Sequence, residues 1–169
     1  MRKNLVLLGM MGVGKSTMGK IVAKKQSLGF IDTDNEIEKK WSMKIAEIFE
    51  QKGEKFFRLE EEKEVLKYLK KTNCVISLGG GAFMNRTIRN NILKNTVSIW
   101  LDNNLKILNK RTKWNKKRPL LNKKNNQKMI NKLYAEREKI YKLANHKINC
   151  EGLNTEEVAK KIIFFYEKQ

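Results

Sequence analysis

The chain has 169 residues, enough for one α/β domain with a sizeable core but not for a second domain of ordinary size. The 37 lysines and arginines against 18 aspartates and glutamates give a net charge of +19, which is compatible with nucleic acid, an anionic membrane or acidic small substrates. A single histidine excludes a histidine-rich metal cluster, and no segment is long enough for a membrane span or a signal peptide. We therefore expect a soluble, cytoplasmic protein, and we attribute the basic excess to compositional drift together with phosphate chemistry rather than to nucleic-acid binding.

The segment 9–16 reads G-M-M-G-V-G-K-S and directly follows an apolar run of strand length, 5–8. Glycines let the backbone curl around a polyphosphate, and the helix that begins there adds free N–H groups and a partial positive charge. In this pattern Lys15 reaches the β- and γ-phosphates and the Ser16 hydroxyl holds Mg²⁺. A tight turn that binds nothing is the alternative, but pattern and context agree on a nucleoside triphosphate site. The residues expected at this nucleotide site are Gly12, Val13, Gly14, Lys15, Ser16 and Thr17.

The remaining elements alternate between strands and helices in chain order. Strands are expected at 5–8, 30–34, 74–78, 97–101 and 147–150, and helices at 16–26, 36–40, 44–52, 54–71, 86–93, 105–110, 128–143 and from 155 onward. Gly53 separates two of these helices, and the glutamates at 60–64 should lie mostly in water. This alternation predicts a parallel sheet covered by helices on both faces.

The segment 112–127 is rich in lysine and asparagine and has little apolar periodicity, so we expect a lid or binding loop there. Ligands of parallel sheets bind beyond the carboxyl ends of the strands. The glycine-rich loop, Asp32 with Asp34, and the glycines at 79–81 each follow an expected strand, so all three should meet in one crevice.

Asp32 and Asp34 are two residues apart, so in an extended segment both carboxylates point the same way. One can meet Mg²⁺ through water while the other accepts a proton from a substrate hydroxyl. An Asx turn that ends the strand is the alternative. The triplet Gly79, Gly80 and Gly81 is either a flexible turn or a place where bare backbone approaches a ligand.

Four arginines have competing interpretations. Arg58 and Arg137 stand near glutamates at helical spacing, which favours ordinary surface ion pairs. Arg118 precedes the single proline inside the expected lid, where an arginine can act on a transferring phosphoryl group. Arg111 lies just before that loop and can stack on a nucleobase.

Taken together, these motifs resemble the shikimate kinase family over essentially the whole chain. The resemblance covers the phosphate loop, the Asp-Thr-Asp at 32–34, Phe57-Arg58 with Glu61, the glycine triplet, Arg111-Thr112, the Arg-Pro-Leu-Leu at 118–121, and Arg137. It implies a P-loop kinase fold with a five-stranded parallel sheet and a mobile lid, forming a single domain over 1–169. It also implies transfer of phosphate from ATP to the 3-hydroxyl of shikimate, with Mg²⁺, by a monomer in aromatic amino acid biosynthesis.

The resemblance further assigns roles to individual residues. Metal binding falls to Ser16 and Asp32, and catalysis to Lys15, Asp34 and Arg118. Arg111 and Arg118 join the ATP site. The shikimate-binding residues are Asp34, Arg58, Glu61, Gly79, Gly80, Gly81 and Arg137, with Glu61 orienting Arg58 and the two arginines clasping the carboxylate.

Two other functions stay open at this point. A related P-loop kinase would act on gluconate or a nucleoside monophosphate, although Arg58, Arg137 and the glycine triplet count against it. A basic nucleic-acid-binding protein with a P-loop would show a clustered basic face with base-stacking aromatics. The three tryptophans are far apart in the sequence and form no such motif.

Overall fold

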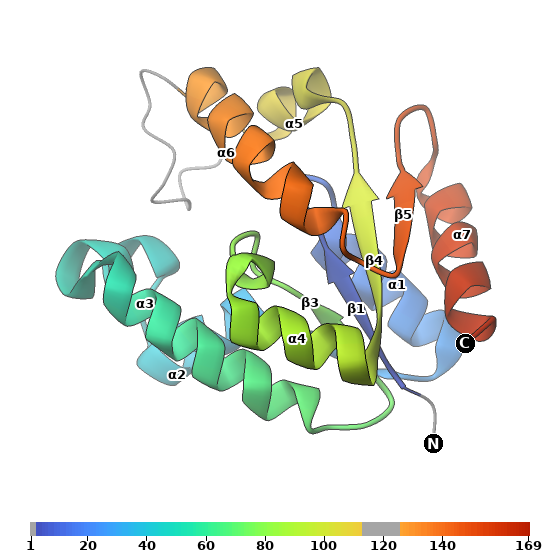
Figure 1. The fold of residues 1–169 in the computed structure, drawn as a ribbon, viewed down its shortest axis with the longest axis horizontal. Helices are drawn as coiled ribbons and strands as arrows, with labels where there is room; N and C mark the ends of the chain where they lie inside the picture. The colour runs from blue at the N-terminus through green and yellow to red at the C-terminus, as the bar shows by residue number, and fades with distance from the viewer. Residues whose placement is uncertain (1–2, 113–125) are drawn as a thin grey trace.

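A computed structural model describes residues 3–112 and 126–169 of the chain. Strands alternate with helices through most of this length (Figure 1). The elements are β1 (Asn4–Leu8), α1 (Lys15–Gln26), β2 (Gly29–Asp32), α2 (Thr33–Trp41), α3 (Ile45–Leu69), β3 (Cys74–Ser77), the 3₁₀ helix η1 (Ala82–Met84), α4 (Arg86–Asn95), β4 (Thr96–Asp102), α5 (Leu105–Thr112), α6 (Asn126–Tyr141), β5 (His146–Asn149) and α7 (Thr155–Glu167).

The five strands form one parallel sheet in the order β2-β3-β1-β4-β5, as the alternation predicts. The central strand β1 pairs with β3 on one side and β4 on the other, so that Leu7 lies opposite both Ser77 and Ile99. Every residue of β1 is buried, because a strand between two neighbours and two helical layers has no face in water. The phosphate loop leaves the carboxyl end of this central strand.

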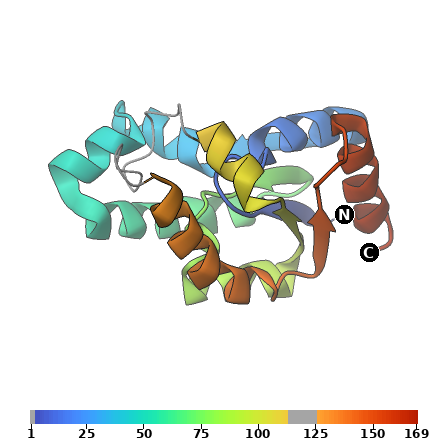
Figure 2. The same ribbon diagram turned by 90° about the horizontal axis from the view of Figure 1, so that it is seen from above.

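Helices cover both faces of the sheet (Figure 2). Helices α1 and α7 pack together on one face, and α3 and α4 pack together on the other. The main core lies between these layers, and a second, smaller cluster of Ile37, Ile48 and Phe57 holds α2 against α3. Within residues 3–112 and 126–169, none of the helices combines the length and apolar character needed to span a bilayer.

Helix α3 departs from the expectation in one respect. Its interruption at Gly53 is confirmed, since this residue has φ 82° and ψ 164° inside an otherwise helical run. The placement of its glutamates in water is wrong: Glu60, Glu61 and Glu64 are 5%, 2% and 4% exposed. Lys40 of α2 lies 2.7 Å from Glu60 and 2.9 Å from Glu64, and this partner from another helix makes the burial of two carboxylates tolerable.

The segment after β2 also differs from the expectation. An extended course through 30–34 is wrong, because α2 begins at Thr33 and Asp32 is its N-cap. The Asp32 carboxylate accepts a hydrogen bond from the backbone N–H of Asn35 at 3.3 Å, which satisfies one of the free donors of the first turn. Asp34 therefore projects from the first turn of a helix rather than from a strand.

Candidate active site

The phosphate loop has the backbone that its glycines predict. Gly9 has φ 140°, and a Cβ there would lie 2.3 Å from the carbonyl oxygen of Leu101. Gly14 has φ 102° and stands as the N-cap of α1, where it offers no side-chain acceptor to the helix. The first turn of α1 also contains no acidic residue. The N–H groups and positive end of α1 are therefore directed at an anion from outside the chain.

The two polar side chains that open α1 are already held in the loop region. Lys15 is 9% exposed, and its Nζ donates to the carbonyl oxygens of Gly9 at 2.9 Å and Met10 at 3.1 Å. The Ser16 hydroxyl donates to the Asp32 carboxylate, and its Oγ lies 3.5 Å from the Ser77 Oγ. Residues from α1, β2 and β3 thus bring hard oxygen donors to one point.

Next to the loop lies a cavity of about 270 Å³. Part of its wall is apolar, from Met11, Phe49 and Phe57. Its charged lining comes from Lys15, Asp32, Asp34, Glu38, Arg58, Glu61 and Arg137. A space lined by both signs of charge suits a small, polar, charged substrate.

Each glycine of the triplet faces one of these charged groups. A Cβ on Gly79 would lie 2.5 Å from Asp34 Oδ1 and 2.7 Å from Glu61 Oε1. On Gly80 it would lie 3.2 Å from Arg137 Nη1, and on Gly81 2.5 Å from Arg58 Nη1. Any larger residue would push these side chains out of place. The triplet is therefore a close approach of backbone to the charged side chains of the site, and its approach to a ligand stays a prediction.

The Glu61 carboxyl of the cavity is strongly perturbed. Burial raises the pKa of its carboxyl from an ordinary 4.5 to about 7, and the nearby Asp34 carboxylate acts in the same direction. The Arg58 guanidinium opposes this change and donates from Nη1 to Glu61 Oε2 at 2.7 Å. Perturbed carboxyl groups of this kind are concentrated at functional sites.

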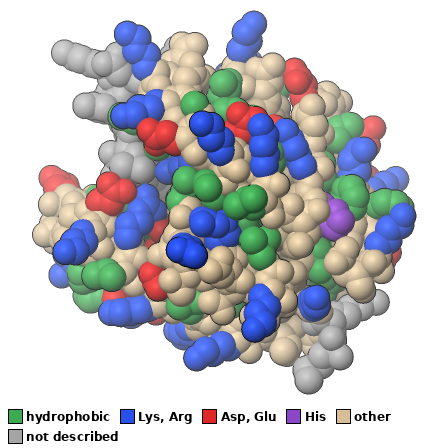
Figure 3. Space-filling model, in the orientation of Figure 1, with side chains coloured by type: hydrophobic (Ala, Val, Ile, Leu, Met, Phe, Trp, Pro, Cys, Tyr) green, Lys and Arg blue, Asp and Glu red, His purple; other side chains and the backbone are tan. Residues whose placement is uncertain are grey.

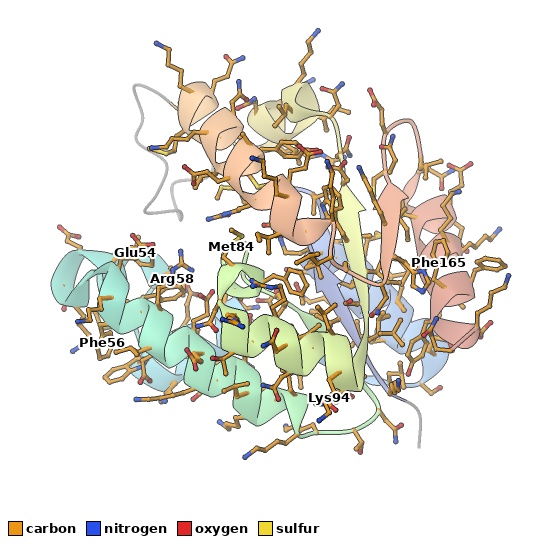
Figure 4. The ribbon with its side chains drawn as sticks, in the orientation of Figure 1. Glu54, Phe56, Arg58, Met84, Lys94 and Phe165 are labelled. Atoms are coloured by element: carbon orange, nitrogen blue, oxygen red, sulfur yellow. The ribbon has the colours of Figure 1, made fainter. Side chains whose placement is uncertain are left out.

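The ion-pair interpretation is partly right for Arg58. Its guanidinium contacts Glu54 of the same helix at 3.2 Å as well as Glu61, and Figure 4 shows Glu54 and Arg58 side by side on α3. For Arg137 that interpretation fails, because Glu138 pairs with Lys142 at 2.9 Å instead. Arg137 is 5% exposed, and its Nη1 has no hydrogen-bond acceptor among the described residues.

Most of the expected site residues meet around the loop and this cavity. Arg111 is exposed outside it, with Nη1 3.3 Å from the carbonyl oxygen of Gly12 in the phosphate loop. Arg118 and most of the expected lid lie outside the described residues.

Sequence reasoning missed Thr33, Ser77 and Tyr141. Thr33 Oγ1 accepts from the Gly79 N–H at 3.0 Å and donates to the Ser77 carbonyl at 3.3 Å, which joins α2 to β3. Tyr141 donates its hydroxyl hydrogen to the Gly80 carbonyl. In the sequence, Tyr141 is indicated only by its position four residues after Arg137 on the same helix.

Comparison with known proteins gives a consistent result. The family model described as shikimate kinase matches residues 11–167. A shikimate kinase from a Sulfurihydrogenibium species is 41% identical over 161 residues, covering 95% of this chain and 96% of that protein. One from Bacillus subtilis is 42% identical over 163 residues, covering 95% and 87%.

Solved structures agree. The shikimate kinase of Acinetobacter baumannii in complex with shikimate has a TM-score of 0.95 at 29% identity, over 99% of this chain and 94% of that one. The Aquifex aeolicus enzyme has a TM-score of 0.86 at 35% identity, over 97% and 96%. A gluconokinase from Sinorhizobium meliloti, with a TM-score of 0.60 and 12% identity over 99% and 94%, shares the fold alone. The family match over nearly the whole chain and relatives about 40% identical show that this chain belongs to the shikimate kinase family.

Proposed function

We propose that the chain transfers the terminal phosphoryl group of ATP to the 3-hydroxyl of shikimate in aromatic amino acid biosynthesis. One observation carries the choice of substrate: the buried Arg137 guanidinium, whose Nη1 has no acceptor among the described residues, lines the same cavity as Asp34 and Lys15. This Nη1 needs an acceptor, and a carboxylate supplies one together with a compensating charge and a match to the planar donors. The cavity thus joins an anion receptor, a basic oxygen and a phosphate loop.

The substrate carboxylate would be held by Arg137 and Arg58 from opposite helices. Arg58 is kept in place by Glu61, whose own burial prevents it from turning to solvent. A Cβ on Gly80 or Gly81 would press on Arg137 or Arg58, so these glycines let both guanidinium groups keep their places. This arrangement selects small carboxylates over neutral sugars, because the charged walls are costly to leave unpaired.

Asp34 would accept the proton of the 3-hydroxyl as its oxygen attacks the γ-phosphorus of ATP. A new bond forms between that oxygen and phosphorus, the bond from phosphorus to the β–γ bridging oxygen breaks, and ADP leaves. Lys15 and the first turn of α1 would hold the phosphates in line. The transition state carries its negative charge on phosphoryl oxygens, so positioning and positive charge account for most of the catalysis.

Mg²⁺ fits the donors beside the loop, where the Ser16 hydroxyl bonds to the Asp32 carboxylate. Within the described ranges, no group of three or more histidine, cysteine, aspartate or glutamate side chains is placed to hold a metal ion. This fits an ion that takes most of its ligands from phosphate and water. When bound, the ion neutralises charge on the phosphates. Ser16 would contact it directly and Asp32 through water.

Two arginines extend the proposal to the nucleotide. Arg111, beside Gly12, would stack on the adenine. Arg118 would approach the transferring phosphoryl group from the lid. We propose further that the enzyme is a single kinase domain that acts as a cytoplasmic monomer.

A coupled ADP-release assay tests the activity, with shikimate, gluconate and nucleoside monophosphates offered separately. Of these acceptors, we expect only shikimate to give turnover. Comparable turnover with gluconate or a nucleoside monophosphate would refute the assignment of shikimate as the substrate.

The nucleic-acid alternative receives little support, because lysine and arginine are scattered over the visible face rather than gathered in one patch (Figure 3).

A further inference from the structure

One face of α6 carries three polar side chains that point into the protein. Tyr134, Arg137 and Tyr141 are spaced by three and four residues, so they lie on the same side of the helix. The Tyr134 hydroxyl donates to Asp102 at the end of β4, at 3.1 Å to Oδ1. The Tyr141 hydroxyl donates to the Gly80 carbonyl. Arg137 lies between the two tyrosines and lines the cavity.

Tyr141 differs from Tyr134 in what it holds. Gly80 is the glycine whose Cβ position is 3.2 Å from Arg137 Nη1 and 3.7 Å from the backbone nitrogen of Met11 in the phosphate loop. The carbonyl that Tyr141 fixes therefore belongs to the residue between the guanidinium and the phosphate loop. Tyr134 fixes a strand end, and neither it nor Asp102 lines the cavity.

The Tyr141 hydroxyl is not needed to fill space. The side chain is 1% exposed, and its ring packs against Trp100 with centroids 5.8 Å apart, a contact that phenylalanine would keep. Burial raises the pKa of the Tyr141 hydroxyl to about 12, with the Arg137 guanidinium acting in the opposite direction. The hydroxyl thus lies near that guanidinium in a dry environment, where its hydrogen bond to the Gly80 carbonyl is strong and directional.

We propose that Tyr141 is a positioning residue for substrate recognition, fixing Gly80 relative to Arg137 so that the guanidinium and the glycine triplet receive the substrate carboxylate together. It does not touch the substrate. This inference rests on the proposed function. It predicts that loss of the hydroxyl weakens shikimate binding and leaves the phosphoryl-transfer step and ATP binding nearly intact.

The experiment compares Tyr141→Phe with Tyr134→Phe, a matched control that removes the same group from the same face of the same helix. For Tyr141→Phe we expect the KM for shikimate to rise about tenfold, since a buried carbonyl loses its donor beside the binding site. Its kcat should stay within about threefold, and the KM for ATP should not change. Tyr134→Phe should show a similar loss of melting temperature with a normal KM for shikimate.

A double variant adds a readout that general loosening of the helix would not give. If Tyr141 acts through Arg137, the free-energy effect on KM of the double variant should be smaller than the sum of the effects of Tyr141→Phe and Arg137→Lys. A normal KM for shikimate in folded Tyr141→Phe, equal KM effects in both tyrosine variants, or full additivity would each overturn the inference. If the unaltered enzyme shows no shikimate-dependent ADP release, the proposed function itself fails.

Discussion

Replacing Arg137 by lysine separates the proposed substrate clasp from an ordinary helix ion pair. Arg137 is 5% exposed, and its Nη1 has no acceptor among the described residues, so a substrate carboxylate would suit it as a partner. Removing one side of such a desolvated charge pair costs about 2–5 kcal/mol, which is about 30-fold to a few thousand-fold in affinity. Lysine keeps the charge but not the planar fork, so we expect a loss toward the lower end of that range.

The assay measures the KM for shikimate, the KM for ATP and the free energy of unfolding of Arg137→Lys. Stability should change by less than about 1 kcal/mol, because the Nη1 donor that lysine removes had no described acceptor to lose. Arg86→Lys is the control, since Arg86 is exposed on α4 and does not line the cavity. A normal KM for shikimate combined with a large loss of stability would show that Arg137 serves the fold and not the substrate.

Three further variants test other parts of the site. Lys15→Ala should abolish phosphoryl transfer with little change in melting temperature, and near-normal turnover would refute the phosphate-loop assignment. Asp34→Asn should lower kcat by about 10²–10⁴-fold, as expected for a general base, and a change confined to KM would limit Asp34 to positioning. Burial raises the pKa of Glu61 from 4.5 to about 7, so the folded state binds this proton more tightly than the unfolded state and loses stability as pH rises through that interval. As the pH rises from 4.5 to 7, the free energy of unfolding of Glu61→Gln in urea should therefore increase by up to about 3 kcal/mol relative to the unaltered protein. A difference between the two proteins that does not change with pH would contradict the raised pKa of Glu61.

The parallel sheet could be predicted from the sequence because its strands are short apolar runs that are buried on both faces. Val6 and Ile76 are examples, each fully buried in a strand bounded by turn residues. The phosphate loop could be predicted equally well, because its glycines are required by the local backbone angles and, at Gly9, by a close contact with the carbonyl oxygen of Leu101. The apolar runs bounded by turn residues and the glycine spacing of the loop are both local patterns, so the sequence alone carries them.

The charged groups of the site were harder to predict from the residues alone. Helical spacing placed Glu61 on a surface face, whereas it is buried against groups from α2 and from the loop after β3. Arg137 stands between two glutamates in sequence, yet it turns toward Gly80, far away along the chain. Only the family resemblance assigned these residues to a substrate site, because their partners are brought together by the fold.

The central claim is that one cavity receives a carboxylate-bearing substrate beside a phosphate loop. The most direct measurement is single-turnover transfer of the γ-phosphoryl group from labelled ATP in the presence of Mg²⁺, with shikimate or its neutral methyl ester as acceptor. We predict labelled shikimate 3-phosphate with shikimate as acceptor, and far slower transfer to the ester, which cannot form an ion pair with Arg137. Equal transfer to acid and ester, or no transfer to shikimate, would contradict it.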